Sequence, residues 1–225
     1  MLQKEVIETG TYRILKSLMQ DPMLDGFNLV GGTALSLYLG HRKSIDLDLF
    51  SKREFDVGGL RRHLAGEYGF KERSSESQTL KGEIDGVFID CIRYDYPDIS
   101  SPVTIEDGIR VSGIPDILAM KLSAITDSGD REKDFVDVSF FSTKFSLNDM
   151  LADYARKYQG ASTMAVMKAL LYYDDVIQGE PVNLISGKYD WKLIQKRLND
   201  MARHPDKIYK DFPILSNVRR RGLKI

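Results

Sequence analysis

The chain has 225 residues, a formal net charge of −1 and a single cysteine. This length can bury one sizeable core, and a net charge near zero excludes a global electrostatic attraction to nucleic acid. One cysteine excludes an intrachain disulfide, no apolar run approaches the ~18 residues of a membrane helix, and the first residues lack a signal-peptide pattern, so we expect a cytoplasmic protein with no membrane partner.

The hydrophobic periodicity predicts strands and helices in the first half of the chain and helices in the second half. The expected elements in chain order are a helix over residues 4–19, a strand over 27–30, a short helix up to 39, a strand over 44–50, a helix over 57–68, a strand-rich segment over 70–112, and helices over 115–125, 146–158, 164–177 and 191–201. The change near residue 112 predicts a core of residues 1–112 followed by a helical region of residues 113–225.

Three small residues after the first predicted strand suggest a phosphate-binding turn. Gly31, Gly32 and Thr33 follow Val30 and open a short helix, which Gly40 should end. Glycine permits positive φ and close backbone approach, Thr33 suits the cap of the helix, and a helix N-terminus favours phosphate. Many ordinary tight turns share this pattern, so its value lies in the short distance to the acids that follow.

Two aspartates lie two positions apart in the alternating segment 44–50. Every second side chain of a strand points to the same face, which places Asp46 and Asp48 together with their backbones about 6.5–7 Å apart. Neighbouring carboxylates repel each other unless a cation or a basic group joins them, and Mg²⁺ binds one or two carboxylates together with substrate phosphates. The pattern favours a divalent-metal site, and the alternative is a solvated strand face.

A hairpin follows, in which Asp85-Gly86 is the two-residue turn between strands over residues 79–84 and 87–94. Asp90 interrupts the apolar run of the second strand. An acid in such surroundings is costly unless it has a cation, a hydrogen-bond partner or solvent at an active-site cleft. The alternative is an edge strand from which Asp90 faces water, whereas the turn explains Asp85.

Two helical segments carry charged residues at spacings that suggest a site. In the helix predicted over 115–125, Lys121 falls on one stripe with Ile117 and Ile125. A lysine on such a stripe either extends its ammonium to solvent or serves a site. Asp134 and Asp137 also share a helical face, and a surface cluster of ion pairs explains this second pattern almost as well.

Two clusters of basic residues are the candidates for a local patch that contacts RNA. They are Arg61-Arg62-His63 and Arg219-Arg220-Arg221. Such clusters are usually solvated, so neither indicates nucleic-acid binding by itself. The three histidines are scattered, which gives no zinc-binding constellation.

Four of these segments resemble, in order, the motifs of one superfamily over about residues 28–140. Gly-Gly-Thr-Ala-Leu, followed by His-Arg-Lys-Ser-Ile-Asp-Leu-Asp-Leu-Phe at residues 41–50, is similar to the first motif of the polymerase-β-like nucleotidyltransferases. It resembles in particular the AbiEii/AbiGii branch, known from toxin components of type IV toxin–antitoxin and phage-abortive systems. The resemblance implies an α/β (α+β) fold, with a mixed sheet flanked by helices and a helical C-terminal region packed on that core.

The resemblance also implies roles for individual residues. Asp46, Asp48 and Asp90 would hold Mg²⁺, with Mn²⁺ as a substitute, and Asp90 completes that site or helps to deprotonate the acceptor hydroxyl. Lys121 would contact the triphosphate and complete the catalytic set. The family pattern Lys-Asp-x-x-Asp matches residues 133–137, whose acids would anchor a basic side chain or shape the nucleotide pocket. The implied nucleotide-binding residues are Gly31, Gly32, Thr33, Arg42, Ser44, Lys121, Asp134 and Asp137.

The implied activity is transfer of a nucleoside monophosphate from an NTP to an acceptor hydroxyl, with release of pyrophosphate. RNA, and tRNA in particular, is the favoured acceptor, and a cognate antitoxin is the expected protein partner. The alternatives are transfer to a protein or a small molecule, and a catalytically silent nucleotide-binding module. The presence of all four residues of the catalytic set argues against the silent module.

Overall fold

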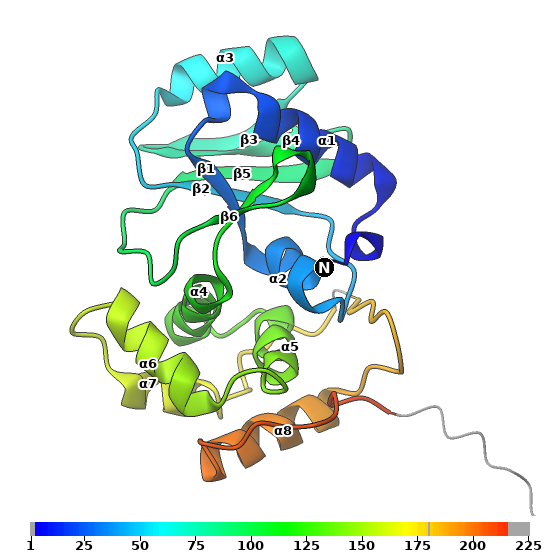
Figure 1. The fold of residues 1–225 in the computed structure, drawn as a ribbon, viewed down its shortest axis with the longest axis vertical. Coiled ribbons are helices and arrows are strands. Elements are labelled where there is room, and N and C mark those ends of the chain that lie inside the picture. The colour runs from blue at the N-terminus through cyan, green and yellow to red at the C-terminus, as the bar shows by residue number, and fades with distance from the viewer. Residues whose placement is uncertain (1–2, 180, 216–225) are drawn as a thin grey trace, which may run out of the picture.

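The computed structural model describes residues 3–179 and 181–215 of the chain (Figure 1). These residues form a seven-stranded mixed sheet with the strand order β3-β4-β5-β2-β1-β7-β6. The strands are β1 Phe27–Val30, β2 Leu47–Ser51, β3 Lys71–Glu76, β4 Thr79–Ile84, β5 Val87–Arg93, β6 Val103–Thr104 and β7 Arg110–Val111. The mixed sheet expected from the sequence is confirmed.

Helices lie on both sides of this sheet, with α1 and α3 above it and α4 to α8 below it in the view of Figure 1. The helices are α1 Thr9–Gln20, α2 Gly31–Leu39, α3 Val57–Tyr68, α4 Ile114–Asp127, α5 Glu132–Phe141, α6 Leu147–Lys157, α7 Thr163–Ala169 and α8 Trp191–Arg203, and short 3-10 turns span Lys4–Val6, Pro22–Leu24 and Glu106–Gly108. Within the described residues, no helix combines the length and the apolar character needed to cross a membrane.

The apolar side chains buried on the sheet and on the helices after it form one cluster. Leu29, Leu49 and Ile89 from β1, β2 and β5 are fully buried. They belong to the same cluster of buried side chains as Phe135 of α5 and Leu198 of α8. Burial of each such side chain stabilises the fold by about 1.5–3 kcal/mol. The helices after the sheet therefore pack on the core. The division of the chain into residues 1–112 and 113–225 remains a prediction.

The turns and helix ends follow the residues that predicted them. Gly40 and Gly69 end α2 and α3 in the left-handed conformation, each with a φ of 68°. Asp85 and Gly86 both have positive φ, of 49° and 78°, as a two-residue type I′ turn requires. The predicted hairpin of β4 and β5 is thereby confirmed.

Two of the predicted helices are wrong in their bounds. The first is broken, because Lys4–Val6 forms a 3-10 turn and α1 begins only at Thr9. The helix expected over 164–177 ends at Ala169, and Ile177 is 71% exposed instead of lying in the core. Ile177 donates its backbone N–H to the carbonyl of Asp130 at 2.9 Å, so a long-range backbone pairing replaces the end of the helix.

Candidate active site

Asp48 and Asp90 lie directly opposite each other on neighbouring strands. β2 and β5 pair in parallel, and Asp48 is the register partner of Asp90. The adjacent residues Leu47 and Ile89 are fully buried, on the other face of the sheet, as strand alternation requires. Because β5 lies between β4 and β2 inside the sheet, the alternative that Asp90 belongs to an edge strand is wrong.

Asp46 lies in the connection before the strand that carries Asp48. β2 begins at Leu47, so the strand expected from residue 44 starts too early. Thr33 holds this connection, because its buried hydroxyl donates to the backbone carbonyl of Asp46 and lies 2.9 Å from the hydroxyl of Ser44. This contact fixes Asp46 and Ser44 beside the first turn of α2.

The expected capping role of Thr33 is wrong. α2 already begins at Gly31, and its N-cap residue is Val30, so no side chain of the cap residue accepts a hydrogen bond from the first turn. Thr33 is therefore inside the first turn, where a threonine hydroxyl is free to bond outside the helix. The hydroxyl of Thr33 instead bonds to residues 44 and 46, which precede β2.

Gly31 and Gly32 bring the start of α2 against two charged side chains. Gly31 has a φ of +70°, and a Cβ at this position would lie 2.0 Å from Oδ2 of Asp48. A Cβ on Gly32 would lie 2.3 Å from Nη2 of Arg42. Close approach therefore requires glycine at both positions, and at Gly31 the positive φ requires it as well.

Asp48 is an acid in an unfavourable environment. The pKa of its carboxyl is raised to about 6, mainly by burial and also by the nearby charges of Asp90 and Asp46, although Lys121 and Arg131 oppose the rise. A raised pKa with this cause means that the ionised carboxyl gains from any additional positive charge beside it. Lys81 already supplies one such charge to the group, since its Nζ lies 3.0 Å from Oδ2 of Asp90.

The carboxylates around Asp48 suit a hard divalent cation by their chemistry. Mg²⁺ prefers oxygen ligands and is usually bound by one or two carboxylates together with water and phosphate oxygens. A cation beside Asp48 would offset the repulsion among the three acids. Within the part of the chain that the structure describes, no three His, Cys, Asp or Glu side chains already converge as a metal site. Part of the ligand set would therefore come from substrate, and the metal role of these acids stays a proposal.

A buried ionic cluster lies next to the acids, with Asp137 at its centre. Arg42 donates to Asp137 from Nε at 2.7 Å and from Nη2 at 2.9 Å. Lys121 donates to Asp134, and its Nζ lies 3.3 Å from Oδ2 of Asp137. Although burial opposes ionisation, Arg42 and Lys121 hold the pKa of Asp137 well below its usual range. Asp134 and Asp137 thus anchor the two basic side chains that sequence analysis assigned to nucleotide binding.

His41, to which sequence analysis assigned no role, belongs to the same cluster. Its Nε2 lies 2.8 Å from Oδ1 of Asp137, and burial lowers the pKa of the imidazole although Asp137 opposes this shift. A neutral His41 that donates from Nε2 fits this geometry, because Asp137 can only accept. Its contribution is to orient Asp137, and no sequence spacing predicts it.

Two hollows meet at Asp48. The first has a volume of about 310 Å³, and Gly32, Ser44 and Asp46 line it together with five cationic side chains, those of Arg42, Lys43, Lys121, Arg131 and Lys133. The second has a volume of about 240 Å³ and aromatic or apolar walls that include Phe50, Tyr94 and Met120. Asp48, Lys121 and Arg131 line both hollows. Two of the three acids predicted to bind metal, Asp46 and Asp48, therefore line the same hollow as residues predicted to bind phosphate, whereas Asp90 lines neither hollow.

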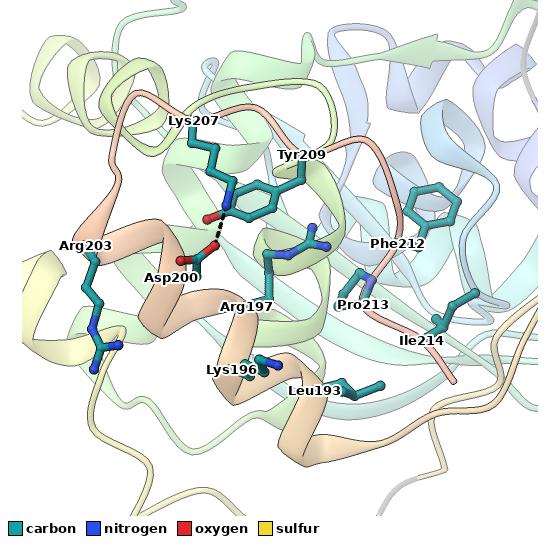
Figure 2. A pocket seen from close by; sticks show the side chains of 10 residues that line it. All are labelled: Leu193, Lys196, Arg197, Asp200, Arg203, Lys207, Tyr209, Phe212, Pro213 and Ile214. Atoms are coloured by element: carbon teal, nitrogen blue, oxygen red, sulfur yellow. Dashed lines mark hydrogen bonds and ion pairs between the residues drawn. The ribbon is translucent and has the colours of Figure 1, made fainter. Parts of the chain in front are cut away.

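A further groove, of about 460 Å³, lies between α8 and residues 207–214 (Figure 2). Asp200 of α8 points toward Lys207 there, and their charged atoms are 2.6 Å apart. None of the site residues predicted from the sequence lines this groove.

The two basic clusters considered for RNA contact have different outcomes. In the first, Arg61 pairs with Glu72 at 3.2 Å. The second, Arg219-Arg220-Arg221, lies outside the described residues.

The fold and the site together define a class of protein. A mixed sheet whose neighbouring strands carry acids, beside a glycine turn that opens a helix and a cationic hollow, defines a nucleotidyltransferase. Residues 13–211 match the family described as the nucleotidyl transferase AbiEii toxin of type IV toxin–antitoxin systems. The chain belongs to this family, which confirms the resemblance inferred from its motifs.

The chain also resembles individual proteins and solved structures to different degrees. The chain is 30% identical over 166 residues to an uncharacterized protein of Aquifex aeolicus (strain VF5), covering 72% of this chain and 80% of that protein. A crystal structure of a candidate nucleotidyltransferase from H. pylori has the same fold, with a TM-score of 0.55, 19% identity and coverage of 88% of this chain and 96% of that one. A Megavirus polyadenylate synthase matches with a TM-score of 0.37 and 15% identity, over 80% of this chain and 35% of that one, which is too low to bear on the fold.

Proposed function

We propose that this nucleotidyltransferase depends on Mg²⁺ and transfers a nucleoside monophosphate from an NTP to a hydroxyl of an RNA, with tRNA as the favoured acceptor. The observation that carries the proposal is that Asp48, the register partner of Asp90, lines a hollow together with five cationic side chains. Such a hollow attracts a triphosphate. Membership of a toxin family supports a role as the toxin of a type IV pair, with a cognate antitoxin as partner.

Residues in and beside the first hollow would each hold a different part of the bound nucleotide. Asp46, Asp48 and Asp90 would hold Mg²⁺, which supplies Lewis-acid stabilisation of phosphate charge when bound. The backbone N–H groups at the start of α2, from Gly31 to Thr33, would donate to the β- and γ-phosphates. Lys121 would add its charge to the triphosphate from a position fixed by α5.

Two further predicted residues, Arg42 and Ser44, would position the triphosphate in the first hollow. Arg42 is held by both oxygens of Asp137 and by the carbonyl of Lys43, to which its Nη1 donates at 3.1 Å. Its guanidinium thus has a fixed position at the first hollow, which it lines. Ser44 also lines the hollow, where its hydroxyl would contact phosphate. Both residues would therefore position the triphosphate relative to the acids.

The proposed reaction is an in-line displacement at the α-phosphorus. The oxygen of the acceptor hydroxyl forms a bond to the α-phosphorus while the bond from that phosphorus to the bridging oxygen of the β-phosphate breaks. Pyrophosphate leaves with the electron pair of the broken bond. Asp90, whose side chain is 22% exposed, would accept the proton of the attacking hydroxyl.

Incorporation of label tests the activity and the acceptor in one experiment. The protein would be incubated with Mg²⁺ and α-³²P-labelled NTPs, in one arm with total tRNA and in the other with a mixture of proteins. We expect label in the tRNA, and none when Asp46→Ala and Asp48→Ala are combined. Label in the protein arm alone would replace RNA by a protein acceptor. NTP binding without transfer in either arm would favour a silent module or a small-molecule acceptor.

Asp46→Asn tests the metal site separately from catalysis. The substitution keeps the shape of the side chain but removes its charge, so we expect loss of Mg²⁺-dependent NTP binding with an unchanged unfolding midpoint in urea. Equal NTP binding by both proteins would place the metal site elsewhere.

A further inference from the structure

The second hollow differs in chemistry from the first. Phe50 of β2 and Tyr94, which follows β5, bring two rings together with their centroids 5.3 Å apart and their planes inclined by 34°. Ile117, Met120 and Ala124 contribute side chains from α4, and residues three and four apart share one face of a helix. Aromatic and apolar groups thus form one part of the wall of the second hollow, whereas five cations line the first. The charged side chains that line the second hollow are Asp48, Lys121, Asp127, Arg131 and Asp134.

The two hollows adjoin at three side chains, since Asp48, Lys121 and Arg131 line both. One molecule that extends past Asp48 would therefore occupy both hollows. A nucleoside triphosphate has the matching form, with a polyanion at one end, a planar heteroaromatic base at the other and the reacting α-phosphorus between them. A triphosphate in the first hollow directs the base into the second, where stacking on an aromatic side chain contributes about 1–3 kcal/mol.

A carboxylate lies at the edge of the second hollow. Asp127, at the end of α4, is exposed and lines this hollow, and the hydroxyl of Ser123 donates to its Oδ2 at 3.2 Å. An ionised carboxylate only accepts hydrogen bonds. It can therefore accept from the exocyclic amine of cytosine, adenine or guanine, whereas the carbonyl oxygens of uracil would meet it with like charge.

We propose that the second hollow is the nucleobase subsite of this enzyme, and that Asp127 selects NTPs whose base carries an exocyclic amine. This inference rests on the proposed function, because it assumes that the first hollow takes the triphosphate. The two can be separated with inorganic tripolyphosphate, which occupies the first hollow and leaves the second empty.

Ala124→Leu tests the subsite by filling it. The matched control is Ala152→Leu, the same change at an exposed position of α6. Binding of CTP and of tripolyphosphate would be measured by calorimetry with Mg²⁺. We expect Ala124→Leu to weaken CTP binding at least about tenfold, a loss of one stacking contact, to leave tripolyphosphate binding unchanged, and Ala152→Leu to change neither.

Each other result has a defined meaning. Unchanged CTP binding by Ala124→Leu, or wild-type affinities that are equal for CTP and tripolyphosphate, would overturn the nucleobase subsite while leaving the proposed function intact. Failure of the wild-type protein to bind either compound would overturn the proposed function and the inference together.

Asp127→Asn tests the selection of the base. We expect the wild-type protein to bind CTP about tenfold more tightly than UTP, in line with one hydrogen bond to a charged group. We expect Asp127→Asn to reduce that ratio to about threefold or less, because an amide both donates and accepts. Asp174→Asn, at an exposed position that does not line the second hollow, is the matched control and should keep the wild-type ratio. Equal wild-type affinities for CTP and UTP would overturn the role of Asp127.

Discussion

Arg42 and Asp137 are 95 positions apart in the sequence and form a two-pronged ion pair, in which Nε and Nη2 of the arginine donate to the two carboxylate oxygens. Arg42 belongs to the segment that leads to Asp46 and Asp48, the acids proposed to bind the metal, and Asp137 belongs to α5. The same carboxylate contacts Lys121 of α4. One buried acid therefore fixes the position of the acid-bearing segment relative to both helices that line the site.

Asp137→Asn should destabilise the protein strongly. The substitution leaves the buried cations Arg42 and Lys121 with one counter-charge fewer, and breaking a buried pair in this way costs about 3–5 kcal/mol. The free energy of unfolding in urea would measure the loss. Asp25→Asn, at an exposed position, should change it by less than about 0.5 kcal/mol. Similar stabilities of the two variants would show that Asp137 does not hold the cluster together.

Gly31→Ala should abolish nucleotide transfer. The new Cβ would meet the Asp48 carboxylate at 2.0 Å and sit on a backbone with a φ of +70°, so the carboxylate of Asp48 must be displaced. A displacement of about 1 Å at a reacting centre can cost about a hundredfold in rate. A rate within threefold of the wild-type value would contradict this account.

Gly66→Ala is the matched control for that glycine substitution. Gly66 lies inside α3, and nothing lies within 4 Å of an added Cβ. Alanine in the interior of a helix is favoured over glycine by about 1 kcal/mol. We therefore expect Gly66→Ala to raise the urea midpoint and to keep the wild-type rate of transfer.

The local parts of the site could be predicted from the sequence, because neighbouring residues fix them. Gly40 and Gly69 end their helices as expected. The two-residue turn of the hairpin fixes the register of its strands. That register places Lys81 opposite Asp90. The pairing therefore follows from the sequence, although it is not among the contacts predicted above.

The long-range parts could not be predicted in this way. No turn sets the parallel register that places Asp48 beside Asp90, and no spacing relates His41 to Asp137. Residues 164–177 have the period of a helix, yet the helix ends at Ala169 and Ile177 pairs with the backbone of Asp130 instead. Tertiary contacts decide these features, and a single sequence shows only their local component.

Asp116→Asn should make the stability of the protein less dependent on pH in the acidic range. Burial opposes ionisation of Asp116, but the ammonium of Lys157 at 2.8 Å and the N–H groups of Ile99 and Ser100 lower its pKa. A carboxyl whose pKa falls on folding adds stability above its unfolded pKa of about 3.9, and this contribution is lost as the pH falls further.

Urea unfolding at pH 7 and at pH 3 would measure this effect. At pH 7 we expect Asp116→Asn to cost about 3–5 kcal/mol, because Lys157 remains buried without its counter-charge, and at pH 3 we expect a smaller difference from the wild-type protein. Asp98→Asn removes a half-exposed pair with Lys52 at 3.3 Å and should cost at most about 1 kcal/mol. An equal cost of Asp116→Asn at both pH values would contradict the lowered pKa.

Lys81→Met should lower the Mg²⁺ concentration that supports half-maximal NTP binding. The ammonium of Lys81 lies 3.0 Å from Asp90, where it competes with a divalent cation for the same carboxylate. An ion pair of this partly exposed kind is worth up to about 1 kcal/mol, so its removal should reduce the Mg²⁺ requirement by about twofold to fivefold. Lys71→Met is the control, since Lys71 is 79% exposed and its Nζ lies 3.6 Å from Glu83, away from the acids. An unchanged or higher Mg²⁺ requirement in Lys81→Met would mean that Asp90 does not bind the metal, and would leave proton transfer from the acceptor hydroxyl as its role.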